Sequence, residues 1–287
     1  MLKHINTMKF RQIRYSLLFF LILIFSITTK AKIPQRIISL APVITKNIYL
    51  LHGENFLVGC TSFCKLKNPD DAQVVASAIQ VNIEKVILLK PDLIIASSLT
   101  NPETIKTFKK LNIDVLYLPL QKSFEDICTD FQTLGKKLGE KELADKIVTQ
   151  ARKEVKSIRE KIPGKDSLPK IFFQIGANPL FSVTSNTFQE DFIDLAGGQN
   201  IADDLTIGSI TREKVLVSNP DVIFISTMGM VGLEEKKRWE SYKNLKAVKN
   251  KKIFFIDQEK TCSPTPDLFV EALNEIIDDI YYRNNEF

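Results

Sequence analysis

The sequence predicts an α/β fold with two similar lobes joined by one long helix. Three observations predict it: short apolar runs alternate with amphipathic stretches, one segment occurs twice, and a long charged helix lies between two sets of apolar runs. Near-continuous apolar runs bounded by Pro, Asn or Asp are typical of parallel strands covered on both faces. The predicted strands are 36–40, 57–61, 92–97, 114–118, 170–175, 221–226 and 252–257.

The long helix is predicted over residues 140–162. Its apolar residues are three or four positions apart, charged residues fill most of the other positions, and Pro163 and Gly164 end it. A helix of about 20 residues is about 30 Å long. Because strands and helices alternate again directly after it, we expect it to join a first lobe (33–139) to a second lobe (169–287).

A repeated segment supports the two lobes. Residues 82–97 align without gaps on residues 211–226, and both copies contain Glu-Lys-Val and Pro-Asp at the same places. Each copy is typical of a helix N-cap (Asn82 or Thr211), a short helix, a turn and a buried strand. Two such lobes would form a cleft between them, where small molecules bind.

The N-terminal segment carries all of the excess positive charge. The formal net charge is +5, and residues 1–31 contain five basic and no acidic residues, which leaves 34 of each sign in the rest of the chain. An apolar run of 12 residues (16–27), too short to span a bilayer, is followed by small residues at Thr29 and Ala31. We expect a signal peptide over residues 1–31, cleaved near Ala31, and an exported, periplasmic or extracytoplasmic protein. An uncleaved membrane anchor is the alternative, and the balanced remainder predicts no nucleic-acid binding.

Motifs for common enzyme chemistries are missing. The sequence has no glycine-rich phosphate or dinucleotide loop, no GxSxG and no HExxH. The one histidine outside the signal segment, His52, lies at the end of a helix predicted over 43–52, where an imidazole favours the helix dipole. We therefore predict no catalytic residues, no metal site and no enzymatic activity.

Four cysteines lie outside the signal segment. Cys60 and Cys64 flank the turn after a predicted strand, Cys128 falls on an apolar helix face, and Cys262 precedes the last helix. A thiolate metal site needs three or four ligands, so CxxxC alone is a weak signal. We expect buried free thiols or one disulfide, with Cys64 and Cys262 able to face a cleft and Cys128 in the core.

Glu84 and Glu213 occupy equivalent places in the repeat, each two residues after its N-cap. One interpretation is that each is a first-turn carboxylate favoured by the helix dipole. The other is that a partner with paired arginines binds both carboxylates at once. The sequence supports these two interpretations about equally.

Several stretches stand in an order and spacing that together are specific. They are 36–45, 58–64, 82–85, 90–96, 135–139, 173–179, 194–201, 211–213, 219–221, and Trp239 followed by 245–250. From about residue 36 to residue 280 the chain resembles the solute-binding proteins of ABC importers for cobalamin, iron-siderophores and haem. The resemblance leans toward the cobalamin-binding branch in stretches 173–179 and 197–201. It implies two Rossmann-like α/β lobes joined by a single long bridging helix, with the ligand cleft between them. It also implies that Glu84 and Glu213 dock onto a permease that works with an ATPase.

The resemblance implies a protein that captures a metal chelate (cobalamin or another corrinoid, a ferric siderophore or haem). We expect it to be a monomer and to hold no cofactor of its own. We interpret Trp239, expected to start a helix over 239–248, as a packing residue, which leaves Phe63 as the one aromatic of the matching loops. Predicted ligand-binding residues follow strands, where α/β clefts gather ligands. They are Pro42, Phe63, Ser98, Asn178, Phe181, Met228 and Glu259. The alternatives are a secreted enzyme that uses Cys64, Cys262 or His52, and an anchored sensor.

Overall fold

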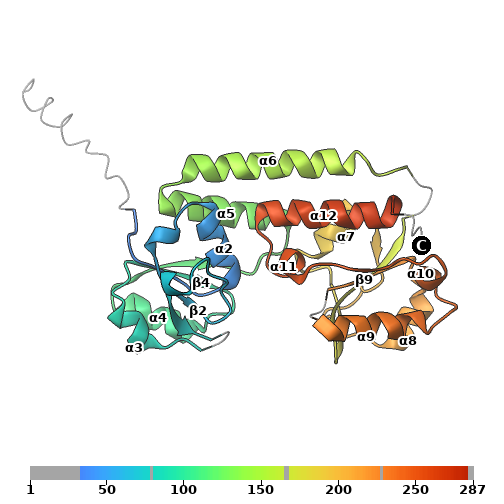
Figure 1. Cartoon of the computed structure of the whole chain (residues 1–287), viewed down its shortest axis with the longest axis horizontal. Helices are drawn as coiled ribbons and strands as arrows, with labels where there is room; N and C mark the ends of the chain where they lie inside the picture. Colours follow the sequence, from blue (N-terminus) through green and yellow to red (C-terminus); the bar gives the residue numbers. More distant parts are fainter. Residues whose placement is uncertain (1–32, 78–79, 165–167, 227–228, 284–287) are drawn as a thin grey trace, which may run out of the picture. The chain divides into compact units, whose positions relative to one another are not determined.

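Two β-sheets organise the chain (Figure 1). The computed structural model describes residues 33–77, 80–164, 168–226 and 229–283. The predicted signal peptide and Met228 lie outside these ranges. None of the described helices is both long enough and apolar enough to cross a lipid bilayer.

The first sheet is parallel throughout, with strand order β3-β2-β1-β4-β5. Its central strands are buried and carry Ile, Leu and Val on both faces, which suits a sheet covered by helices on each side. The strands are β1 (Ile37–Ser39), β2 (Leu57–Thr61), β3 (Gln73–Ala76), β4 (Leu93–Ser97) and β5 (Asp114–Leu118). The helices of this half are α2 (Pro42–Leu50), α3 (Ile83–Leu88), α4 (Pro102–Lys110) and α5 (Phe124–Leu138), with short 3-10 turns at Glu54–Phe56 and Pro69–Asp71.

The second sheet is mixed, with strand order β10-β9-β6-β7 and β8 paired to β6. Only β7 is antiparallel to its neighbour among the described pairs. The strands are β6 (Lys170–Ala177), β7 (Leu180–Ser182), β8 (Gln199–Asn200), β9 (Val222–Ile225) and β10 (Ile253–Phe255). The helices are α7 (Glu190–Leu195), α8 (Arg212–Ser218), α9 (Gly229–Glu240), α10 (Lys246–Lys249), α11 (Gln258–Thr261) and α12 (Pro266–Tyr281).

The long helix α6 (Lys141–Arg159) lies between the two sets of strands in the sequence and packs against α5 and α12 (Figure 1). A Cβ added at Gly135 of α5 would lie 2.3 Å from the Cβ of Ala144, so glycine allows the close approach of α5 and α6. Helix α12 also contacts α5, and Phe124 stacks on Phe269 with ring centroids 4.6 Å apart. Helix α12 as well as α6 therefore contacts α5 of the first half. The prediction of a single bridging helix, and the predicted boundaries 33–139, 140–162 and 169–287, stay predictions.

All seven predicted strands are confirmed. Strands β3, β7 and β8 were not predicted, because half of β3 is exposed, β7 follows β6 after a turn of only two residues, and β8 has only two residues. Two helix predictions were wrong in detail. Trp239 lies near the end of α9 instead of starting a helix, although its interpretation as a packing residue is confirmed by its complete burial. The helix predicted over 43–52 begins at Pro42 and ends at Leu50, and His52 follows it with a φ of 54°.

Candidate functional site

Three of the predicted ligand-binding residues lie at one edge of the first sheet. Pro42 begins α2 shortly after β1, Phe63 follows β2, and Ser98 follows β4. Strands β2, β1 and β4 are parallel neighbours, so their carboxyl ends meet at the same edge. The Phe63 side chain is 62% exposed there and Ser98 is also exposed. This edge therefore presents an aromatic ring and a hydroxyl to solvent.

The other predicted ligand-binding residues belong to the second half. Asn178 is exposed in the turn between β6 and β7, and Phe181 is half-buried in β7, where it pairs with Ser209. Glu259 lies on α11, which follows β10. The parallel strands β6, β9 and β10 end at one edge, and the β6–β7 turn lies at the same end of β6. These residues thus occupy the corresponding edge of the second sheet.

Glu259 is bound by two lysines from the first half. Its carboxylate lies 2.5 Å from Nζ of Lys46 and 2.9 Å from Nζ of Lys65. Lys46 also donates to the carbonyl oxygens of Glu259 (3.3 Å) and Ser263 (3.2 Å). The hydrogen bonds from Lys46 and then Lys65 lower the pKa of the Glu259 carboxyl. Glu259 therefore holds α11 against α2 in this structure, and a ligand would have to compete with both lysines for its carboxylate.

Cys64 lies at the Phe63 end of β2 in a polar setting. Its sulfur lies 3.1 Å from Oγ1 of Thr45 and 3.3 Å from Oγ1 of Thr61. The pKa of the Cys64 thiol is lowered mainly by a hydrogen bond from Cys60, because that bond stabilises the Cys64 thiolate. Cys262 is half-buried near Ser226, with 4.0 Å between sulfur and Oγ.

The cysteine predictions are in part confirmed. All four described cysteines are free, and Cys128 is completely buried in the core. Among the described residues no group of three His, Cys, Asp or Glu side chains is arranged to hold a metal ion.

Glu84 and Glu213 are the second residues of two short capped helices. Oδ1 of Asn82 accepts a hydrogen bond from the backbone N–H of Lys85 (2.9 Å), and Oγ1 of Thr211 accepts one from the backbone N–H of Lys214 (3.2 Å). Both predicted N-caps are therefore confirmed. Glu84 and Glu213 are exposed, and among the described residues neither carboxylate has a hydrogen-bond or ion-pair partner.

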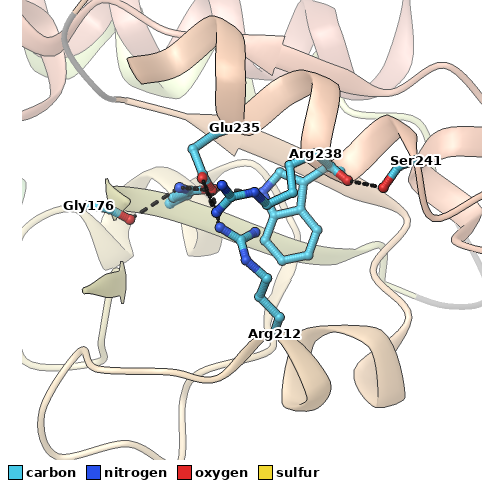
Figure 2. Close-up of polar contacts among 7 residues, drawn as sticks. Gly176, Arg212, Glu235, Arg238 and Ser241 are labelled. Atoms are coloured by element: carbon cyan, nitrogen blue, oxygen red, sulfur yellow. Dashed lines mark hydrogen bonds and ion pairs between the residues drawn. The ribbon is translucent and has the colours of Figure 1, made fainter. Parts of the chain in front are cut away.

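A buried polar network anchors the start of α8 (Figure 2). The carboxylate of Glu235, on α9, is buried and accepts hydrogen bonds from Nη2 of Arg212 (2.6 and 2.8 Å) and from Nε2 of Gln174 (2.9 Å). Trp239 donates from Nε1 to Oε1 of Gln174 at 2.7 Å, and the Arg212 guanidinium lies 4.6 Å from the Trp239 ring centroid. Because Arg212 is the first residue of α8, this network holds the helix that carries Glu213.

This network was not predicted from the sequence. Gln174 and Glu235 are 61 residues apart, and Glu235 stands in a run of charged residues that is typical of an exposed helix. Only the presence of a lone tryptophan next to that run indicates that this stretch has a buried face.

Three known proteins match this chain over two thirds or more of its length. A relative from Bacillus subtilis, named as the uncharacterized ABC transporter substrate-binding lipoprotein YvrC, is 29% identical over 262 residues, which cover 88% of this chain and 82% of the relative. The vitamin B12-binding protein of Pectobacterium carotovorum is 30% identical over 205 residues, covering 69% of this chain and 73% of that protein. The crystal structure of the periplasmic vitamin B12 binding protein BtuF of Vibrio cholerae superposes with a TM-score of 0.75 at 24% identity, covering 86% of this chain and 96% of BtuF.

The family whose sequence pattern matches this chain is described as periplasmic binding protein, and the match extends over residues 37–260. That range includes both sheets, both capped helices and the Glu235 network. The chain belongs to the periplasmic binding protein family.

Proposed function

We propose that this protein is the substrate-binding component of an ABC importer, which captures a metal chelate and delivers it to a membrane permease. The observation that carries the proposal is the pair of exposed carboxylates of Glu84 and Glu213, which lie at equivalent places in two similar halves and have no partner within the described part of the chain. A permease with basic side chains at two places could bind both halves at once. The names of the relatives, an ABC transporter substrate-binding lipoprotein and a vitamin B12-binding protein, support the same role.

We propose a corrinoid such as cobalamin as the first ligand to test, with haem and ferric siderophores as the other members of the class. The relatives named for vitamin B12 support this order. Phe63 offers an exposed aromatic ring at the sheet edge where ligands of α/β proteins gather, and a flat macrocycle gains affinity from such contacts. The ligand-binding set proposed with it is Pro42, Ser98, Asn178, Phe181, Met228 and Glu259.

We further propose that the protein is exported with a signal peptide cleaved near Ala31, is monomeric, and has no enzymatic activity. The lipoprotein name of one relative supports export. Cys64 supports the alternative of a secreted enzyme, because its lowered pKa gives it thiolate character. Conversion of a bound corrinoid or haem that stops in the Cys64→Ser variant would favour that alternative.

The test is a titration of the chain from residue 32 onward with cyanocobalamin, hemin and a ferric hydroxamate siderophore. Visible absorption or calorimetry should be the readout, since corrinoids and haem absorb visible light. We expect saturable 1:1 binding of one chelate, and a loss of about fivefold to tenfold in affinity for Phe63→Ala.

Tyr117→Ala is the matched control, because Tyr117 is an exposed aromatic within β5 and is not among the proposed ligand-binding residues. It should leave the affinity unchanged. Absence of saturable binding for all three probes would refute the proposed function.

A further inference from the structure

We propose that each docking helix makes a two-part contact with the permease, a carboxylate together with an exposed aliphatic side chain one turn later. The pairs are Glu84 with Leu88 on α3 and Glu213 with Val217 on α8. The partner surface would then carry, at each of two places, a cationic side chain beside an apolar pocket. This inference rests on the proposed function and adds an apolar part to its docking surface.

Exposure singles out Leu88 and Val217. Val217 is 86% exposed and Leu88 is 78% exposed, the highest values for large apolar side chains among the described residues. On the same two helices Val86 and Val215 are completely buried. Each helix therefore has one apolar side chain in the core and another almost entirely in water.

Single exposed apolar residues are common on protein surfaces and by themselves indicate nothing. These two differ because they are equivalent positions of the internal repeat, each six residues after the N-cap. An exposed aliphatic side chain thus occupies the same position in each copy of the repeat, as the exposed glutamate does.

The glutamate and the aliphatic residue share one face of each helix. Residues four apart lie about one turn apart on the same side of an α-helix, so Leu88 lies next to Glu84, and Val217 lies next to Glu213. An exposed carboxylate beside an exposed aliphatic side chain matches a protein surface that offers a cation beside an apolar pocket. Charged contacts of this kind set orientation and rate, and the buried apolar contact adds affinity.

Both helices are held rigidly enough to present such a face. Helix α8 is fixed by Arg212, which is bound to Glu235 and stacked on Trp239, and α3 is fixed by Ile83 and Val86 packed in the apolar core. A preorganised surface loses little conformational freedom when it binds.

The test measures binding of the chelate-loaded protein to its cognate permease, reconstituted in lipid nanodiscs. The variants are Leu88→Ser, Val217→Ser and the double variant. Each single variant should weaken permease binding about fivefold and the double variant at least about twentyfold, while the Kd for the chelate changes less than twofold. Leu88→Ile and Val217→Ile should bind the permease as the unmodified protein does.

Matched controls are Leu111→Ser in the first half and Leu233→Ser on α9, because both leucines are about half exposed and lie away from the two docking pairs in sequence. Both controls should bind normally. Unchanged permease binding by the double variant would overturn the inference while leaving the proposed function intact. Three other results would overturn it as well. The unmodified protein could bind a chelate but no permease, or the serine variants could lose affinity for the chelate. The serine variants could also change the oligomeric state, which would show that two copies pair through this face.

Discussion

The two copies of the repeat, residues 82–97 and 211–226, fold in the same way. Each begins with a confirmed N-cap, continues into a helix of six or seven residues and ends in a buried parallel strand. Between helix and strand the chain passes through a left-handed residue, Lys90 in the first copy and Asn219 in the second, both with a φ of 47°. The repeat therefore extends to backbone conformation and is more than a resemblance in sequence.

The aspartates of the two Pro-Asp turns have the same role. Asp92 accepts hydrogen bonds from the backbone N–H groups of Gln35 (2.8 Å) and Arg36 (2.9 Å), just before β1. Asp221 accepts one from the backbone N–H of Lys170 (2.9 Å), where β6 begins. Each aspartate thus fixes the start of the strand that pairs with the strand of its own repeat.

The copies differ at the residue after the N-cap. In the first copy this is Ile83, which packs against the apolar cluster around Val86. In the second copy it is Arg212, whose guanidinium is bound to the buried Glu235 and lies over Trp239. The same local backbone is therefore held once by apolar packing and once by a buried ion pair. An ion pair of this kind is sensitive to loss of either partner, because the remaining charge stays buried.

The largest expected effect comes from removing one charge of this pair. Glu235→Ala should lower the free energy of unfolding by about 3–5 kcal/mol, because Arg212 and Gln174 lose their shared acceptor. Ile83→Ala, the matching change in the first copy, should cost about 1–2 kcal/mol since Ile83 is only half-buried. Urea denaturation followed by circular dichroism measures both.

Two further variants separate the ion pair from general loss of structure. Arg238→Ala removes a second, exposed partner of Glu235 at 3.3 Å and should cost less than about 1 kcal/mol. The double variant Arg212→Met with Glu235→Leu should recover most of the stability lost in Glu235→Ala, since no buried charge remains. A double variant as unstable as the single one would refute a dominant role for the unpaired charge.

The second prediction concerns the two aspartates. Asp92→Ala should destabilise the protein by about 2–3 kcal/mol and Asp221→Ala by about 1.5–2 kcal/mol, because Asp92 accepts two backbone hydrogen bonds and Asp221 accepts one. Asp221 also lies 3.3 Å from Nζ of Lys246, a partly exposed ion pair that adds little. The same denaturation assay applies. A larger loss for Asp221→Ala would contradict the comparison.

The parts of this structure that follow from local chemistry were predictable from the sequence. The strands, the two N-caps and the buried Cys128 depend on neighbouring residues and on apolar periodicity. The placement of Pro42, Phe63 and Ser98 at one sheet edge also follows, because parallel strands end together.

What could not be predicted depends on partners far apart in the chain. Lys46 and Glu259 are separated by 213 residues, and no periodicity links them. The repeat did not predict the partners of Arg212 either, because the first copy has isoleucine at that position. Arg212 is largely buried because the tertiary fold brings Glu235 and Trp239 next to it.

The smallest expected effect lies at the left-handed turn. A lysine with a φ of 47° is strained because its Cβ crowds the backbone, whereas asparagine tolerates this conformation. Lys90→Asn should therefore raise the free energy of unfolding by about 0.5–1 kcal/mol. Asn219→Lys should lower it by a larger amount, about 1–2 kcal/mol, because Oδ1 of Asn219 also accepts a hydrogen bond from the backbone N–H of Lys246 at 2.9 Å. If exchanging the two residues had equal and opposite effects, backbone strain alone would account for this position and the hydrogen bond from Lys246 would contribute nothing.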